Sequence, residues 1–295
     1  MPKNRFSAIL LAFIGIVQVA ASCELHGYYL GINPNYNQHS LSLRYRYASF
    51  SSIIAGTHIH PNGQLHTHDQ PSAYNTYELW GRFYPHPKVQ LLISAPYHHN
   101  TSFPIKKGSI GDVTTIAQYQ ILHTRSDSAV LMHRVFFGGG IKAPTGKYKP
   151  DEIYSNLQTG TGSLDFLITT SYIGKYKKFG ISADGAYKVT TANNYDYQFA
   201  KRLNLNTNVF YQYNKGDVTL IPSTGFFYEL AGYDTYKNVT LGNTGTEVIF
   251  NGIGVDFYYR QLSLNIAWQV PLYEQSNELL KNNYRFLIGI NYALK

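Results

Sequence analysis

Apolar and polar side chains alternate along this chain in one strand-length segment after another, from residue 40 to residue 295. The clearest segment has apolar side chains at Leu41, Leu43, Tyr45 and Tyr47 and polar ones at Ser40, Ser42, Arg44 and Arg46. Residues 285–294 repeat the alternation. Because successive side chains on a strand point to opposite faces, each segment predicts a strand with one apolar face and one polar face.

Turn residues divide the alternating part of the chain into about twelve segments. The predicted strands cover residues 40–52, 73–85, 88–100, 110–123, 129–143, 161–175, 178–191, 196–214, 217–231, 246–260, 262–274 and 283–294. Tight connections alternate with longer ones, as in outer-membrane barrels, which have short periplasmic turns and longer extracellular loops. We therefore predict an all-β fold, namely a transmembrane, antiparallel, up-and-down β-barrel of about 12 strands over residues 40–295.

A targeting segment precedes the predicted barrel. Lys3 and Arg5 stand before an apolar run over residues 8–19, and small residues follow at 20–22. This order is typical of a signal peptide, and the run is too short to cross a bilayer comfortably as a helix. We predict a signal peptide over residues 1–22 and a segment over 23–39 that lies in the periplasm or inside the barrel mouth. Cys23, the single cysteine, is either a lipidated N-terminus or a residue left by ordinary cleavage.

The composition fits strands that face lipid on one side and water on the other. Charged residues make up 14% of the chain and aromatic residues 15%, with 27 Tyr against 2 Trp. Tyrosine has an apolar ring and a polar tip, so it suits the two interfaces of a membrane barrel. A tyrosine-rich soluble β-sandwich is the alternative. The net charge is +8, and the basic residues are dispersed along the chain. We therefore expect the positive charge to face lipopolysaccharide or to line the lumen, and we do not expect it to bind nucleic acid.

Turning every apolar strand face toward lipid fixes which charged residues face the lumen. A charge that faces mid-bilayer lipid costs about 2–4 kcal/mol for Arg or Lys, so the inward orientation is strongly favoured. The predicted inward set is Arg44, Arg46, Glu78, Arg82, Arg134, Lys142, Asp165, Asp184, Lys188, Arg202, Glu229, Asp256 and Arg260. Seven of them fall in periplasmic strand halves and are the candidate lumen and solute-binding residues: Arg44, Arg46, Glu78, Arg82, Arg134, Asp256 and Arg260. They form either a constriction that favours anionic or polar solutes, or a salt-bridge network that fills a narrow barrel.

Histidines gather in the first predicted long loop, residues 53–72. The candidate metal ligands are His58, His60, His66 and His68, which Asp69 follows. Two more histidines, at 98 and 99, are predicted at the top of a neighbouring strand. Pairs of the form His-x-His can chelate zinc, copper or nickel through neutral imidazole, whereas a solvated loop also tolerates histidines without a metal site. Zinc or copper at this loop is the one cofactor that the sequence suggests.

Catalytic motifs are scarce. The chain has no Gly-x-Ser-x-Gly elbow and no phosphate-binding glycine loop, and its run of three glycines at 138–140 lies within a predicted strand. We therefore predict no enzymatic activity, with a membrane-embedded hydrolase as the enzymatic alternative. Residues 289–294 resemble the C-terminal signal that the barrel-assembly machinery reads. That machinery and the outer-membrane lipids are the expected partners, besides a small solute.

Three motifs within residues 78–190 carry a family resemblance. They are Gly111-Asp112, the run Gly140-x-Lys142-x-Pro144-Thr145-Gly146, and the run Gly160-x-Gly162-Ser163-x-Asp165. Their order resembles the meta-pathway phenol-degradation family of outer-membrane proteins of Gram-negative bacteria, whose members are commonly labelled transporters. The resemblance implies a barrel with a transport role and supplies neither a substrate nor catalytic residues. Proline and glycine at these positions favour a turn at the extracellular rim, which acts either as a gate or as a fixed loop.

The sequence thus leaves three functions from different classes. The main prediction is a channel or transporter-like barrel that passes a small solute, with anionic and aromatic solutes as the candidates. The first alternative is a non-conducting surface barrel that binds a ligand or a divalent metal through its histidine-rich loop. The second is the membrane-embedded hydrolase. Conductance separates the channel from the binding barrel, and lipid hydrolysis identifies the enzyme.

Overall fold

A computed structural model describes residues 37–54, 68–102, 105–124, 131–149, 158–276 and 280–294. Its strands are β1 (Ser40–Ile54), β2 (His68–His86), β3 (Val89–Ser102), β4 (Ile105–Ile110), β5 (Val113–Thr124), β6 (Leu131–Ala143), β7 (Asp165–Tyr176), β8 (Phe179–Val189), β9 (Tyr197–Gln198), β10 (Arg202–Tyr211), β11 (Tyr213–Lys215), β12 (Val218–Ala231), β13 (Thr235–Tyr236), β14 (Val239–Thr240), β15 (Thr246–Tyr259), β16 (Leu262–Ser276) and β17 (Leu280–Ala293). Within these ranges, no helix is long and apolar enough to cross a membrane.

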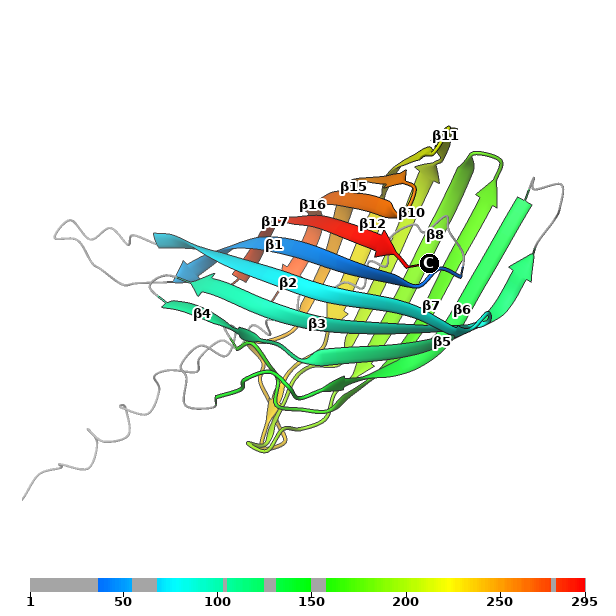
Figure 1. Cartoon of the computed structure of the whole chain (residues 1–295). Coiled ribbons are helices and arrows are strands. Elements are labelled where there is room, and N and C mark those ends of the chain that lie inside the picture. The colour runs from blue at the N-terminus through cyan, green and yellow to red at the C-terminus, as the bar shows by residue number, and fades with distance from the viewer. Residues whose placement is uncertain are drawn as a thin grey trace, which may run out of the picture.

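The main sheet is antiparallel and closes on itself (Figure 1). The first strand, β1, pairs with the last strand, β17, so that Ser40 lies opposite Ala293. On the other side of the barrel, β10 pairs with β12. Closure pairs β1 with β17, so the barrel wall is not left open between its first and last strands. The predicted all-β, antiparallel, up-and-down barrel is confirmed.

The 14 elements of the main sheet make twelve barrel strands, because two strands are each built from two elements. Both β4 and β5 pair with β3, and they are separated by Gly111 and Asp112. Both β10 and β11 pair with β12, and they are separated by Gln212. The predicted count of about 12 strands is therefore confirmed, and two of these strands are interrupted.

Tight turns and both ends of the barrel-forming chain lie at one end of the barrel. The turns 87–88, 177–178 and 260–261 each join two adjacent strands. At the same end, the backbone N–H of Leu294 donates to the carbonyl oxygen of His39 at 2.7 Å. Because outer-membrane barrels have their short turns in the periplasm, this end is periplasmic. The small sheet of β9, β13 and β14 lies at the opposite, extracellular end.

The two faces of the barrel wall differ as the alternation predicts. On the outer face, Leu43 is 67% exposed and Ile290 is 57% exposed. Their neighbours point inward, where the Ser42 hydroxyl donates to Asn291 Oδ1 at 2.6 Å. A continuous outer band of apolar side chains would be unstable in water and is stable against lipid. The protein is thus a β-barrel of the bacterial outer membrane.

Two strands begin later than the alternation predicts. The strand expected from residue 161 begins at Asp165, and the strand expected from residue 196 begins at Arg202. The residues before each strand leave the wall. Thr161 is buried and donates its hydroxyl hydrogen to Asp112 Oδ2 at 2.7 Å, while residues 197–198 pair within the small extracellular sheet. Local polar contacts therefore override an alternation that continues past the strand ends.

Candidate functional site in the barrel lumen

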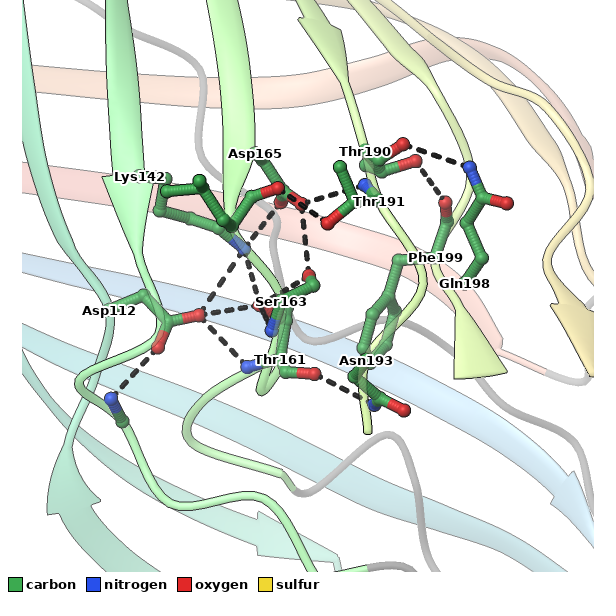
Figure 2. A network of polar contacts seen from close by, with 12 residues as sticks. Asp112, Lys142, Thr161, Ser163, Asp165, Thr190, Thr191, Asn193, Gln198 and Phe199 are labelled. Atoms are coloured by element: carbon green, nitrogen blue, oxygen red, sulfur yellow. Dashed lines mark hydrogen bonds and ion pairs between the residues drawn. The ribbon is translucent and has the colours of Figure 1, made fainter. Parts of the chain in front are cut away.

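A lysine near the extracellular end of β6 holds the following loop to the barrel wall (Figure 2). Lys142 Nζ lies 2.7 Å from Asp165 Oδ2, 3.2 Å from Asp112 Oδ2 and 2.6 Å from Thr161 Oγ1. All four side chains are buried. We call these residues, together with Ser163, the Lys142 cluster. Burial of its charges is tolerated because each charge has partners of opposite sign or hydrogen-bond donors within reach.

Backbone donors complete the Lys142 cluster. Asp112 Oδ1 accepts the N–H of Gly146 at 2.8 Å, and Asp112 Oδ2 accepts the N–H of Thr161 at 2.9 Å. Ser163 Oγ donates to Asp165 Oδ1 at 2.9 Å. Both described ends of the β6–β7 connection are thereby attached to the carboxylate that separates β4 from β5. This geometry favours the fixed-loop role over the gate for the motifs of the sequence.

A second buried charge group, the Glu229 cluster, bridges the lumen. Glu229 of β12 is fully buried and pairs with Arg202 of β10 and, at 3.1 Å, with Arg285 Nη1 of β17. Because β15 and β16 separate β12 from β17 in the wall, the second pair crosses the interior. The Arg285 guanidinium carbon lies 4.0 Å from the centroid of the Phe250 ring, and its Nη2 donates to Asn282 Oδ1 at 3.1 Å. The cluster narrows the lumen at this level.

A third polar group occupies the periplasmic half. Arg46 of β1 pairs with Glu78 of β2, and Trp80 Nε1 donates to the second oxygen of that carboxylate at 2.9 Å. The guanidinium of Arg44 lies 4.5 Å from the centroid of the Trp80 ring, which is a cation–π distance. The two arginines therefore project into the lumen two residues apart on the same strand. The inward register of β1, read from its alternation, accounts for this arrangement.

Three cavities follow one another inside the barrel. The central cavity, about 850 Å³ with its open space, lies at the level of Arg46 and Arg285. A side cavity of about 350 Å³, likewise with its open space, shares Asn206 and Phe227 with it. A periplasmic cavity of about 440 Å³, again with its open space, shares Leu92 with the side cavity and extends to the polar residues at positions 40 and 42, at the beginning of β1. The shared lining residues place these spaces next to one another, in a series from the periplasmic end to mid-barrel.

An apolar cluster separates the side cavity from the periplasmic cavity. Trp80, Leu92 and Ile116 are buried and pack together on the inner face of β2, β3 and β5. Leu92 lines both cavities. Apolar constrictions in a pore act as barriers because water wets them poorly. The junction at Leu92 is therefore the apolar point along the series of cavities.

Six of the seven candidate lumen residues face the interior, and one does not. Arg44 and Arg82 line the periplasmic cavity, and Arg46 lines the central cavity. Three more are buried on the inner face: Glu78, Arg134 and Asp256. From the wider inward set, Asp184 lines the side cavity, and the remaining members are buried: Lys142, Asp165, Lys188, Arg202 and Glu229. Their participation in solute binding stays a prediction.

The prediction that Arg260 faces the lumen is wrong. Strand β15 ends at Tyr259, and Arg260 lies in the tight turn that follows, with a φ of 52°. Its side chain is 68% exposed, and its Nε lies 2.8 Å from Asp217 Oδ2 of the adjacent turn. The alternation extends one residue too far here, because the turn rotates the backbone and releases the side chain to solvent at the periplasmic end.

The candidate metal site lies mainly outside the described residues. His58, His60 and His66 fall within 55–67, and of His68 only the backbone is described, at the beginning of β2. In the part of the chain that the structure covers, no three His, Cys, Asp or Glu side chains converge as metal ligands. The metal site therefore stays a prediction. The predicted signal peptide, Cys23 and most of the segment 23–39 also lie outside the described ranges.

Two important lumen residues are absent from the candidate set derived from the sequence. Arg285 lies on the polar face of the last strand, so the alternation signal was sufficient to find it. Asp112 was recognised only as part of a motif, because the break between β4 and β5 hides its inward position from a count of alternating residues. Thr161, which contacts Asp112 and Lys142, was also missed, because it lies outside every strand and carries no alternation signal.

Comparisons with known proteins support the fold. No family model matches the chain, and no curated protein matches it, so the resemblance to the meta-pathway phenol-degradation family is not confirmed. Among solved structures, the chain is similar to an outer membrane channel from Pseudomonas putida F1, with 15% identity and a TM-score of 0.64 over 90% of this chain and 100% of that chain. This likeness concerns the outer-membrane barrel fold.

Two further solved structures are similar at lower scores. One is a KdgM porin, with 10% identity and a TM-score of 0.41 over 86% of this chain and 99% of that chain. The other is the outer membrane phospholipase A from Escherichia coli, with 13% identity and a TM-score of 0.34 over 88% of this chain and 98% of that chain.

Proposed function

We propose that this outer-membrane barrel is a channel for a small anionic or aromatic solute. The observation that carries the proposal is the series of three neighbouring cavities, which share Leu92, Asn206 and Phe227 as lining residues. A narrow barrel that is filled only for stability has its interior occupied by side chains and leaves no such series. The motif resemblance to a family labelled as transporters, and the fold shared with an outer membrane channel, agree with this function.

The charges that line the cavities support an anionic solute. Arginines line two of the three spaces: Arg44 and Arg82 the periplasmic cavity, and Arg46 and Arg285 the central cavity. Among the described lining residues of these two cavities there is no carboxylate, and the side cavity contributes Asp184 alone. A low-dielectric passage lined by one sign of charge concentrates ions of the opposite sign. The lumen is therefore expected to favour anions.

Planar-bilayer recording of the refolded barrel tests the proposal. We expect discrete conductance steps and, under a potassium chloride gradient, a reversal potential that indicates anion preference. Arg46→Gln removes a lumen charge and should reduce that preference, whereas Arg260→Gln removes an arginine from the periplasmic turn and serves as the matched control. A silent membrane from protein whose folding is shown by heat-modifiable gel mobility would contradict the channel.

The other two functions have distinct readouts in the same preparation. Calorimetric heat from zinc or copper that disappears on replacing His58, His60, His66 and His68, together with a silent membrane, would favour the non-conducting binding barrel. Release of fatty acid from phospholipid vesicles would favour the membrane-embedded hydrolase. We expect neither result.

A further inference from the structure

The central cavity presents positive charge without an accompanying carboxylate. Of its described lining residues, Arg46 and Arg285 are charged, and none is Asp or Glu. The carboxylates that pair with these arginines, Glu78 and Glu229, are almost completely buried and lie behind the lining. A solute in this cavity therefore contacts the guanidinium groups and not the carboxylates that pair with them.

Several side-chain nitrogens around the central cavity are buried donors with no hydrogen-bond partner among the described residues. They include the Nε of Arg46, the Nε of Arg285 and the Nδ2 of Asn208. Arg285 is 8% exposed; its Nη1 donates one hydrogen to Glu229 and its Nη2 donates one to Asn282, whereas its Nε donates to no described residue. Buried donors are normally paired, and a guanidinium offers no acceptor. These three atoms together suit a ligand that supplies acceptors.

The other part of the same cavity is apolar and aromatic. Tyr74 and Phe227 line it and are buried. Ala48 lies between Tyr74 on one neighbouring strand and Arg285 on the other, so a small side chain separates the aromatic wall from the cationic wall. Gly252 and Gly254 of β15 also line the cavity, without side chains. The space thus accommodates a flat apolar body next to a negatively charged group.

We propose that the central cavity is a binding site for a small aromatic carboxylate. The carboxylate accepts hydrogen bonds from Arg46, Arg285 and Asn208, and the ring packs against Tyr74 and Phe227. The site deepens the channel function proposed above and rests on it, because the same solute then passes through the lumen. Recognition of the solute comes from acceptor geometry and ring contact together, so that acetate and benzyl alcohol each satisfy only half of the site.

Isothermal titration calorimetry on the refolded full-length barrel tests the site with benzoate, acetate and benzyl alcohol as probes. We expect benzoate to bind more tightly than either of the others. Asn208→Ala removes an unpaired donor without breaking an ion pair, and one hydrogen bond to a charged group corresponds to about tenfold weaker benzoate binding. Phe227→Leu should weaken benzoate by roughly 3- to 10-fold through lost ring contact and leave acetate unchanged. Arg260→Gln, at the exposed turn, should change nothing.

The outcomes separate this site from the channel. Discrete conductance with no benzoate heat overturns the site and leaves the channel standing. Benzoate heat that Asn208→Ala weakens, in a barrel that does not conduct, supports the site and contradicts the channel. Equal affinity for benzoate and benzyl alcohol overturns the site, because the cationic wall would then have no role. Benzoate binding that is insensitive to both Asn208→Ala and Phe227→Leu also overturns it, because the solute would lie elsewhere.

Discussion

Gly146 and Gly160 touch each other backbone to backbone, on the two sides of the β6–β7 connection. A Cβ atom on Gly146 would lie 2.7 Å from the Cα of Gly160, and one on Gly160 would lie 2.6 Å from the Cα of Gly146. Real Cβ atoms do not approach other atoms this closely, so neither position accepts another residue without a backbone shift. This contact brings both described segments of the connection, residues 144–149 and 158–164, within reach of the Asp112 carboxylate.

Gly160→Ala is expected to loosen the attachment of the connection to Asp112. Insertion of a methyl group into a packed contact costs about 1–3 kcal/mol. We expect faster hydrogen exchange at the backbone amide of Thr161, which donates to Asp112. Gly242→Ala is the matched control, since a Cβ there meets nothing within 4 Å. Unchanged Thr161 exchange in Gly160→Ala would show that the close approach is not what holds the connection.

Lys142→Met is expected to destabilise the barrel by about 3–5 kcal/mol, the range for breaking a buried ion pair by removing one partner. The variant leaves the carboxylates of Asp112 and Asp165 buried and close to each other. The urea unfolding midpoint of the refolded barrel measures the loss. Lys88→Met, in an exposed periplasmic turn, is the control and should have little effect.

A double variant distinguishes charge from packing in the Lys142 cluster. Adding Asp165→Asn to Lys142→Met removes one of the two carboxylate charges that have lost Lys142, and it should recover part of the lost stability. The effects of substitutions within one ionic network on the free energy of unfolding are not additive. A double variant that is less stable than Lys142→Met alone would indicate that Asp165 stabilises the barrel through contacts other than its ion pair with Lys142.

The alternation of residues predicts the wall of the barrel well and its interruptions poorly. The period of two places Arg44 and Arg46 on the inner face, because a strand has no other way to arrange successive side chains. Arg260 obeys the same period in the sequence and nevertheless leaves the lumen, because the turn conformation is decided by two residues and not by a strand-length pattern. The alternation of apolar and polar residues therefore does not predict where a turn rotates a side chain out of the lumen.

The lumen site is formed by contacts between segments that are distant in the chain, and a single sequence does not show such contacts. Glu229 and Arg285 meet across the lumen although 56 positions separate them. Small residues such as Ala48 and Gly252 line the central cavity, and neither position alone indicates in the sequence that a cavity lies there. The Lys142 cluster was accessible in part, because its residues belong to motifs, but only the fold brings the three motifs together.

Leu92→Ala is expected to increase single-channel conductance. The side chain of Leu92 lies between the side cavity and the periplasmic cavity and belongs to an apolar cluster that water wets poorly. Removing it should widen the junction, at a cost in stability of at most about 2–5 kcal/mol. Leu91→Ala is the matched control, because Leu91 is the next residue on β3 and faces the opposite side of the wall. Equal conductance in both variants would mean that the junction at Leu92 does not limit passage.

The extracellular sheet should become more stable as the pH falls, because of Asp234. This carboxyl lies between β12 and β13 and accepts the hydroxyl of Tyr197 at 2.5 Å and the N–H of Ala200 at 2.7 Å. Burial is the largest influence and raises the pKa of Asp234, although the two hydrogen bonds and the charges of Arg202 and Lys188 oppose it. A raised folded-state pKa means that the contribution to stability is complete below the ordinary aspartate value of about 4 and is lost as the pH rises through the folded value.

Hydrogen exchange at the Ala200 amide, corrected for the intrinsic rate, measures this effect as a free energy of opening. In the unmodified protein that free energy should be larger at pH 4 than at pH 7. Asp234→Asn keeps an acceptor for the Ala200 N–H and removes the titrating charge, so the variant should show the same value at both pH values. If the free energy of opening in the unmodified protein instead decreases on acidification, and Asp234→Asn abolishes that decrease, then the hydrogen bonds to the ionised carboxylate outweigh its burial and the assigned direction of the pKa shift is wrong.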